Sequence, residues 1–207
     1  MDALSPLNAR GIDEGRSWLS KAGGGDQIGD ELFPRWLQVR SDPADSACLQ
    51  RPWADSGQAH AARAWIEAGK VQTVSRDRFW AKKTDKEPVP HPPNILMSGL
   101  DKSVQDLVKD TERGVLITRL FYVRSVDPQT LLHTGLTRDG VFWIESGEIV
   151  HPVTNFRWND SPVRILKNAL EASRPVRVSP RGSGGTNMVV PALKVSGFEL
   201  SSVSDEI

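Results

Sequence analysis

The histidines and the single cysteine are the side chains in this sequence best suited to metal chemistry. A catalytic zinc ion needs imidazole, thiolate or carboxylate donors that converge on one point, and a helix supplies two of them when two histidines lie one turn apart. No two histidines here have that spacing; they stand at His60, His91, His133 and His151. The sequence therefore predicts no catalytic residue and no metal ligand in this chain. His133 and His151 fall on neighbouring predicted strands, so a hydrogen-bonded pair and a cryptic metal site both remain open.

The sequence supports nucleophilic catalysis no better than it supports metal-dependent catalysis. Cys48 is the only cysteine, so it cannot form an internal disulfide, and it lies in a polar, turn-rich stretch where a loop thiol is expected. No serine lies in the G-x-S-x-G elbow that presents a nucleophile between a strand and a helix. Hydrolysis by the isolated chain therefore lacks a recognisable set of groups.

One short run, Arg138-Asp139-Gly140, is the candidate substrate-binding segment. An Asp-Gly pair favours a short hairpin turn, because glycine tolerates the left-handed backbone that the strand twist requires. On this interpretation Asp139 serves the turn, and Arg138 either lies in solvent or points into a peptide-binding groove. The substrate-binding hypothesis consists of Arg138, Asp139 and Gly140.

The segments around that run are predicted to form a meander of strands. Residues 115–126 are rich in β-branched and aromatic side chains, which favours a long strand whose apolar side, with Val115, Ile117, Phe121 and Val123, faces the core. Three more strands are expected at 130–136, 141–145 and 148–153, with reversals at 137–140 and 146–147. An unpaired strand edge can receive a peptide as an added strand, and the candidates are 115–126 and a final strand at 188–195.

The remaining elements are short. A hairpin is expected from strands at 62–66 and 71–80, with Gly69 in its turn. Helices are expected at 13–20, at 100–113 with Asp101 or Ser103 as the cap, and from Ser161 until Pro175 ends it.

Together these elements predict an α+β fold that is mainly antiparallel β, either a twisted sheet or a partly closed, barrel-like meander, with two or three helices. Residues 1–207 are expected to form a single domain. A proline-rich surface linker is expected near 82–98, and a glycine-rich mobile loop near 179–187.

The composition of the chain restricts the classes of partner that it is expected to bind. Lys plus Arg equals 26 and Asp plus Glu equals 26, so no long-range charge favours nucleic acid or an acidic membrane. No apolar stretch approaches the length of a membrane span, and Met1 is followed by Asp2 rather than by a signal segment. We expect a cytoplasmic protein that contacts neither nucleic acid nor membrane.

Several segments, taken in order, resemble the C-terminal half of TldD/PmbA-type proteins. They are Asp13-Glu14-Gly15-Arg16-Ser17, Ser41-Asp42-Pro43-Ala44-Asp45, Arg63–Val71, Gly114–Arg119, the long run Thr134–Ile149 that continues into Asn155–Asn159, and Met188–Val195. That family is known as cytoplasmic zinc metallopeptidases with related partner subunits, so the resemblance implies peptide chemistry and a homo- or heterodimer with a TldD/PmbA relative. The implied substrate is a peptide or an unfolded protein.

The resemblance also implies where zinc would be held in complete family members. The paired-histidine helix would precede residue 1, and a cysteine near the C-terminal end can complete the ligand set. This sequence has Gly182-Ser183-Gly184-Gly185 where that cysteine would fall. The leading hypothesis is therefore a C-terminal domain that shapes a peptide-binding cleft and a dimer contact for proteolysis without binding zinc itself. Whether the chain is an enzyme stays open, and the alternative is a non-catalytic scaffold or binding module that assembles with a full-length relative.

Overall fold

The computed structural model describes residues 7–178 and 188–204, which form two compact units. The N-terminal unit contains residues 7–100 together with 174–178 and 188–192. The C-terminal unit contains residues 101–173 and 193–204. The single domain expected over residues 1–207 stays a prediction.

The N-terminal unit is built on a six-stranded sheet with two short helices, α1 (Ala9–Asp13) and α2 (Arg78–Thr84). The strand order is β10-β11-β4-β1-β2-β3, and every neighbouring pair is antiparallel except β11 with β4. The strands are β1 (Val39–Ser41), β2 (Arg63–Glu67), β3 (Lys70–Val71), β4 (Ile95–Met97), β10 (Val176–Val178) and β11 (Met188–Val190).

Buried polar contacts fix the irregular part of this unit. Trp65 is fully buried on β2, and its indole Nε1 donates to the Ser41 hydroxyl at 2.8 Å. The buried Asn94 amide donates to the carbonyls of Asp42 and Cys48, both at 2.7 Å, and accepts from the Asp42 amide at 2.9 Å. Because buried polar groups are costly unless paired, these bonds hold the loop after β1 in one conformation.

The hairpin predicted around Gly69 is confirmed, but the element after it is not. Ala68 and Gly69 have φ of 48° and 75°, which suits a tight turn between β2 and β3. The strand predicted at 71–80 ends at Val71, and α2 begins at Arg78 because the Asp77 carboxylate accepts from the Trp80 amide at 2.7 Å. A capping carboxylate offers the backbone a helical start that competes with a strand.

The first helix is also displaced from its predicted position. The side chain of Asn8 accepts from the amides of Arg10 and Gly11, so α1 spans Ala9–Asp13 rather than 13–20. The range 82–98, predicted as a surface linker, includes the end of α2 and the whole of β4. The mobile loop expected at 179–187 lies outside the described residues.

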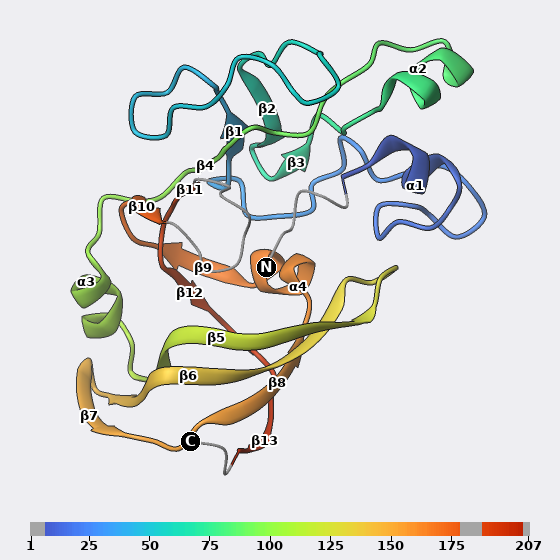
Figure 1. The fold of residues 1–207 in the computed structure, drawn as a ribbon. Helices are drawn as coiled ribbons and strands as arrows, with labels where there is room; N and C mark the ends of the chain where they lie inside the picture. The colour runs from blue at the N-terminus through green and yellow to red at the C-terminus, as the bar shows by residue number, and fades with distance from the viewer. Residues whose placement is uncertain (1–6, 179–187, 205–207) are drawn as a thin grey trace. The chain divides into compact units, whose positions relative to one another are not determined.

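The C-terminal unit contains a five-stranded antiparallel sheet with the order β13-β8-β6-β5, and β7 also pairs with β6 (Figure 1). A two-stranded antiparallel sheet, β9 with β12, and two helices, α3 and α4, complete it. The bounds are α3 (Val104–Lys109), β5 (Arg113–Asp127), β6 (Leu132–Glu145), β7 (Glu148–Pro152), β8 (Phe156–Asp160), α4 (Pro162–Lys167), β9 (Ala169–Ala172), β12 (Leu193–Val195) and β13 (Leu200–Val203).

Local capping signals place both helices of this unit. Ser103 and Asp106 form a capping box at the start of α3, and Ser161 caps α4 with Pro162 at its first position. The helix predicted from Ser161 to Pro175 nevertheless ends at Lys167. Residues 169–172 form β9 instead, because pairing with β12 buries Ala169 and Ala172 and overrides the helical pattern.

The final strand predicted at 188–195 is split. Pro191 and Ala192 separate β11 from β12, and the two strands belong to different sheets. Proline has no N–H to donate to a ladder, so it favours a break at this point.

The core of the C-terminal unit lies around Trp158. This indole is fully buried, donates from Nε1 to the Leu136 carbonyl at 3.2 Å, and lies 5.7 Å from the Phe198 ring centroid. Trp158 pairs with Gly135, where a Cβ atom would lie 2.7 Å from the indole, so only glycine allows this approach.

The fold class is confirmed: the chain is α+β and mainly antiparallel β. The described residues contain four short helices, where the sequence predicts two or three. The additional helix is α2, which begins where a strand was expected.

Candidate functional site

Arg138, Asp139 and Gly140 lie inside strand β6, and the prediction that they form a hairpin turn is wrong. β6 runs without interruption from Leu132 to Glu145 along β5. Arg138 pairs with Arg119 and Val141 pairs with Ile117, so β6 carries one extra residue at this point. Asp139 and Gly140, with φ of 62° and 129°, therefore form a β-bulge. A bulge needs the same left-handed backbone as a hairpin turn, which explains the error.

The bulge is fixed from the neighbouring strand. The Thr118 hydroxyl lies 2.9 Å from the Gly140 carbonyl oxygen and 3.3 Å from that of Arg138. A Cβ atom on residue 140 would lie 2.9 Å from Cε2 of Phe142 and 3.2 Å from the Thr118 hydroxyl. These contacts restrict position 140 to glycine and orient the flanking side chains.

Two arginines from neighbouring strands meet on one aromatic ring beside the bulge. Arg119 and Arg138 are direct cross-strand partners, and their guanidinium carbons lie 5.3 Å and 4.5 Å from the Phe121 ring centroid. The Asp139 carboxylate forms an ion pair with Arg119 and lies 3.9 Å from Nε of Arg138. We call Arg119, Phe121, Arg124 and Arg138, with Tyr122, the arginine surface.

A second irregularity on β5 extends this surface toward the tip of the hairpin. Phe121 pairs with Leu136 and Arg124 with Thr134, so β5 carries an extra residue here, and Tyr122 has a φ of 51°. The Tyr122 side chain is 59% exposed, with the Arg124 guanidinium 4.6 Å from its ring centroid. The bulges on the two strands thus flank Arg119 and Phe121.

Strand β5 stands at the end of its sheet. Among the described residues it pairs with β6 alone over its fifteen residues, while β7 and β8 share the other side of β6 (Figure 1). The prediction that 115–126 forms an edge strand is confirmed. None of its residues is fully buried. The predicted core-facing residues are all half-buried, namely Val115, Ile117, Phe121 and Val123, whereas three residues assigned to the other side are exposed.

The prediction of an edge strand at 188–195 is correct for β12 and wrong for β11. β11 lies between β10 and β4 and is an interior strand, whereas β12 pairs with β9 alone within the described chain. β12 is three residues long, compared with fifteen for β5, so β5 is the better candidate to receive an added strand.

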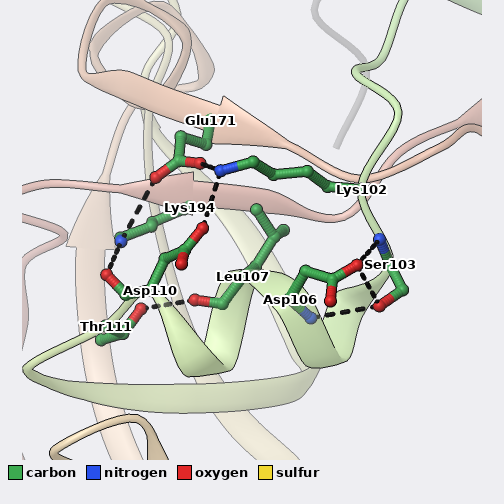
Figure 2. Close-up of polar contacts among 8 residues, drawn as sticks. All are labelled: Lys102, Ser103, Asp106, Leu107, Asp110, Thr111, Glu171 and Lys194. Atoms are coloured by element: carbon green, nitrogen blue, oxygen red, sulfur yellow. Dashed lines mark hydrogen bonds and ion pairs between the residues drawn. The ribbon is translucent and has the colours of Figure 1, made fainter.

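A second charged group of the C-terminal unit joins helix α3 to the β9–β12 pair (Figure 2). Lys102 Nζ contacts Asp110 at 2.7 Å and also contacts Glu171, while Lys194 Nζ contacts Glu171 at 3.4 Å and the Asp110 carbonyl at 2.6 Å. We call these four residues the lysine–carboxylate cluster. Hydrogen bonds from Lys102 lower the pKa of both carboxyl groups, and those carboxylates raise the pKa of Lys102.

The potential metal donors are dispersed in the described chain. No group of three His, Cys, Asp or Glu side chains there could hold an ion. His133 lies on β6, and His151 pairs with Trp143 of the same strand. Positions 133 and 143 are ten residues apart along β6, which corresponds to roughly 30 Å. The two histidines therefore do not form the pair considered from the sequence. The donor set of the described residues does not fit a zinc site.

Cys48 is buried rather than exposed in its loop, and burial raises the pKa of its thiol. A buried thiol with a raised pKa stays protonated near neutral pH and is a poor nucleophile or ligand. His60 has a lowered pKa, caused first by burial and then by the Arg51 charge, so it is neutral under the same conditions.

Sequence reasoning missed Arg119, Phe121 and Tyr122 as site residues. The alternation from Arg119 to Arg124 assigned Phe121 to an apolar core face, because a regular strand places every second residue on one side. The available signal was a pair of adjacent aromatic residues, Phe121 and Tyr122, flanked by Arg119 and Arg124. The bulges around these residues depend on the pairing of β5 with β6 and cannot be seen in one strand alone.

No described helix is long and apolar enough to cross a membrane.

Solved structures share this fold. The structure of TldE from Thermococcus kodakarensis superposes with a TM-score of 0.78 at 18% identity, over 95% of this chain and 45% of that one. A candidate modulator of DNA gyrase from Bacteroides thetaiotaomicron gives a TM-score of 0.77 at 19% identity, over 97% of this chain and 43% of that one.

Sequence comparison leads to the family itself. The chain is 26% identical over 151 residues to the "Metalloprotease PmbA homolog" of Buchnera aphidicola, which covers 70% of this chain and 33% of the relative. The chain thus spans about a third of that relative and less than half of the solved structures. The model of the PmbA/TldA metallopeptidase C-terminal domain matches residues 2–202. With nearly its whole length matched, this chain belongs to the PmbA/TldA metallopeptidase C-terminal domain family.

Proposed function

We propose that this chain acts as the C-terminal domain of a TldD/PmbA-type metallopeptidase, where it shapes a peptide-binding cleft and a dimer contact for proteolysis. The observation that carries the proposal is strand β5, a long end strand that pairs on one side only within the described residues. The substrate is a peptide or an unfolded protein that adds to β5 as a further strand.

Strand addition suits a peptidase that accepts many sequences. Backbone N–H and C=O groups on an open strand edge provide affinity that depends little on the side chains of the peptide. The bulges of β5 and β6 increase the local twist, so they limit the length of straight edge that a peptide can follow. Arg138, Asp139 and Gly140 lie one strand away from that edge and bind substrate through the Arg138 side chain.

Zinc chemistry, in this proposal, is supplied from outside the described chain. The dispersed histidines and the buried cysteine do not fit a zinc site, and the matched metalloprotease relative is about three times as long as the part aligned here. The chain therefore binds peptide without cleaving it, and activity requires assembly with a TldD/PmbA relative in the cytoplasm.

N-methylated peptides test strand addition directly. A fluorescent nine-residue peptide of alternating threonine and valine is titrated against the full chain and followed by anisotropy. Methylation of every second amide blocks one edge of the peptide but leaves the other edge free to pair with β5, so binding is expected to be kept. Methylation of all the amides blocks both edges and is expected to abolish binding. Equal binding by the two methylated peptides would contradict strand addition.

A non-catalytic scaffold is the competing function, and the lack of a fitting donor set among the described residues is what favours it. A scaffold would co-purify with a full-length relative but would bind neither peptide in the titration above. Chelator-sensitive cleavage by the full-length relative, measured with and without this chain, separates the two functions, because a scaffold adds nothing to the cleavage rate of its partner.

A further inference from the structure

We propose that the arginine surface gives the β5 edge a preference for extended peptides that carry an acidic side chain. This inference rests on the proposed peptide-binding function and names the class of substrate. It begins from the like charges that face each other on β5 and β6.

Arg119 and Arg138 occupy directly opposed positions on neighbouring antiparallel strands. Like charges in such positions repel each other, so the arrangement is unfavourable without a compensating group. Stacking on the Phe121 ring compensates in part, because the π face attracts each guanidinium group. An anion placed between the two arginines would compensate further.

The carboxylates on the β5–β6 hairpin neutralise these arginines only in part. Asp139 pairs with Arg119 but lies at 3.9 Å from Arg138, and its side chain is 51% exposed. Asp127 is engaged in its own turn, where its carboxylate accepts from the Thr130 hydroxyl and the Gln129 amide, which lower its pKa. Arg124 adds a third positive charge beside Tyr122.

An added strand would bring its side chains within reach of these arginines. Neighbouring strands lie about 4.8 Å apart, and side chains directly opposite each other on one face interact. Arg119 and Phe121 are two residues apart on the same face of β5, and the Arg138 side chain already extends over Phe121. A glutamate on the added strand opposite Arg119 would meet both guanidinium groups.

A peptide fits this surface better than a nucleic acid. Three arginines beside an open backbone edge supply few phosphate contacts, and the formal net charge of the chain is zero. The edge itself offers hydrogen bonds in the spacing of a β-ladder, which a peptide backbone matches and a sugar-phosphate backbone does not.

The test uses three labelled nine-residue peptides that differ only in a central Glu, Gln or Lys, titrated against the full chain by anisotropy at low salt. We expect the Glu peptide to bind about fivefold more tightly than the Gln peptide, and the Lys peptide to bind most weakly. The difference should shrink at high salt, because exposed ion pairs are screened.

Protein variants assign the preference to the arginine surface. Arg138→Gln should remove most of the difference between the Glu and Gln peptides, because the Glu peptide loses more affinity than the Gln peptide. Arg138→Lys keeps the charge and should restore part of the preference. The matched control is Arg35→Gln, which removes the same charge from a side chain that is 82% exposed in the N-terminal unit and should change nothing.

Each outcome has a separate meaning. Equal affinities for the three peptides would overturn the acidic preference and leave the peptide-binding function standing. A loss of preference in Arg35→Gln equal to that in Arg138→Gln would reduce it to bulk charge and overturn it as well. Tighter binding of a single-stranded oligonucleotide than of the Glu peptide would assign the surface to another partner. Binding of none of the peptides would remove the proposed function itself.

Discussion

The C-terminal unit contains two charged clusters with opposite balance. In the lysine–carboxylate cluster, Lys102 and Lys194 face Asp110 and Glu171, so two cations meet two anions at short range. In the arginine surface, Arg119, Arg124 and Arg138 have one ion-paired carboxylate among the described residues, that of Asp139. Positive and negative charges balance within the lysine–carboxylate cluster, whereas the arginine surface has an excess of positive charge.

The difference separates a structural role from a binding role. Internal pairing in the lysine–carboxylate cluster joins α3 to the β9–β12 pair and leaves little charge for a ligand (Figure 2). Excess positive charge beside an end strand keeps its attraction for an outside anion. Charge balance within a cluster is therefore more informative about function here than the number of charged groups.

The largest expected effect comes from breaking the bulge that positions the arginines. Gly140→Val places a branched side chain at a φ of 129° and 2.9 Å from the Phe142 ring. We expect a loss of about 1–3 kcal/mol in the free energy of unfolding, measured by urea denaturation.

A control separates backbone strain from crowding at the bulge. Gly15→Val also has a positive φ, 71°, but no atom lies within 4 Å of its Cβ position, so it should cost less. An unchanged midpoint for Gly140→Val would mean that this position does not need glycine.

The next effect compares the two clusters directly. Lys102→Gln removes the cation that contacts both Asp110 and Glu171 and should lower the urea midpoint. Arg138→Gln removes one of two opposed like charges and should change the free energy of unfolding by no more than about 0.5 kcal/mol. A larger loss from Arg138→Gln than from Lys102→Gln would reverse the assignment of structural and binding roles.

The smallest effect is a pH dependence carried by the lysine–carboxylate cluster. Lys102 lowers the pKa of Asp110 and Glu171 below their ordinary values of 3.8 and 4.5. Groups with a lowered pKa in the folded state stabilise the fold fully above the ordinary value, and the contribution is lost as the pH falls through the folded value. The Lys102 pKa is raised, so its own contribution is complete below its ordinary value of 10.5 and is lost only at higher pH.

Urea midpoints measured from about pH 7 to about pH 3 check this linkage. The midpoint of the unmodified chain should fall more steeply in acid than that of Lys102→Gln, in which both carboxyl groups lose the Lys102 ammonium group. Parallel curves for the two proteins would show that the cluster does not contribute in this range.

Local signals in the sequence predicted the parts of the fold that depend on a few adjacent residues. The turn at 146–147 forms with φ of 48° at Ser146 and 80° at Gly147, and Ser161 with Pro162 starts α4 as expected. Such features succeed because backbone preference and capping act within one turn of chain.

The candidate site was predicted only in part, because its geometry depends on distant pairing. The sequence singled out Arg138, Asp139 and Gly140 but placed them in a turn, since Asp-Gly favours positive φ in a turn and in a bulge alike. The continuous pairing of β5 with β6 on both sides of Gly140 decides between the two. Phe121 was assigned to an apolar core face. It is half-buried, and its stacking with Arg119 and Arg138 depends on the pairing of β5 with β6.

The amino-acid order alone determined the family resemblance, the antiparallel α+β class and the tight turns at 68–69 and 146–147, because these depend on short segments and their local conformational preferences. Tertiary structure alone decided that β5 is an end strand, that residues 169–172 form a strand, and that two arginines meet on Phe121. Those outcomes follow from hydrogen bonds and side-chain contacts between segments far apart in the chain, whose register a local pattern does not specify.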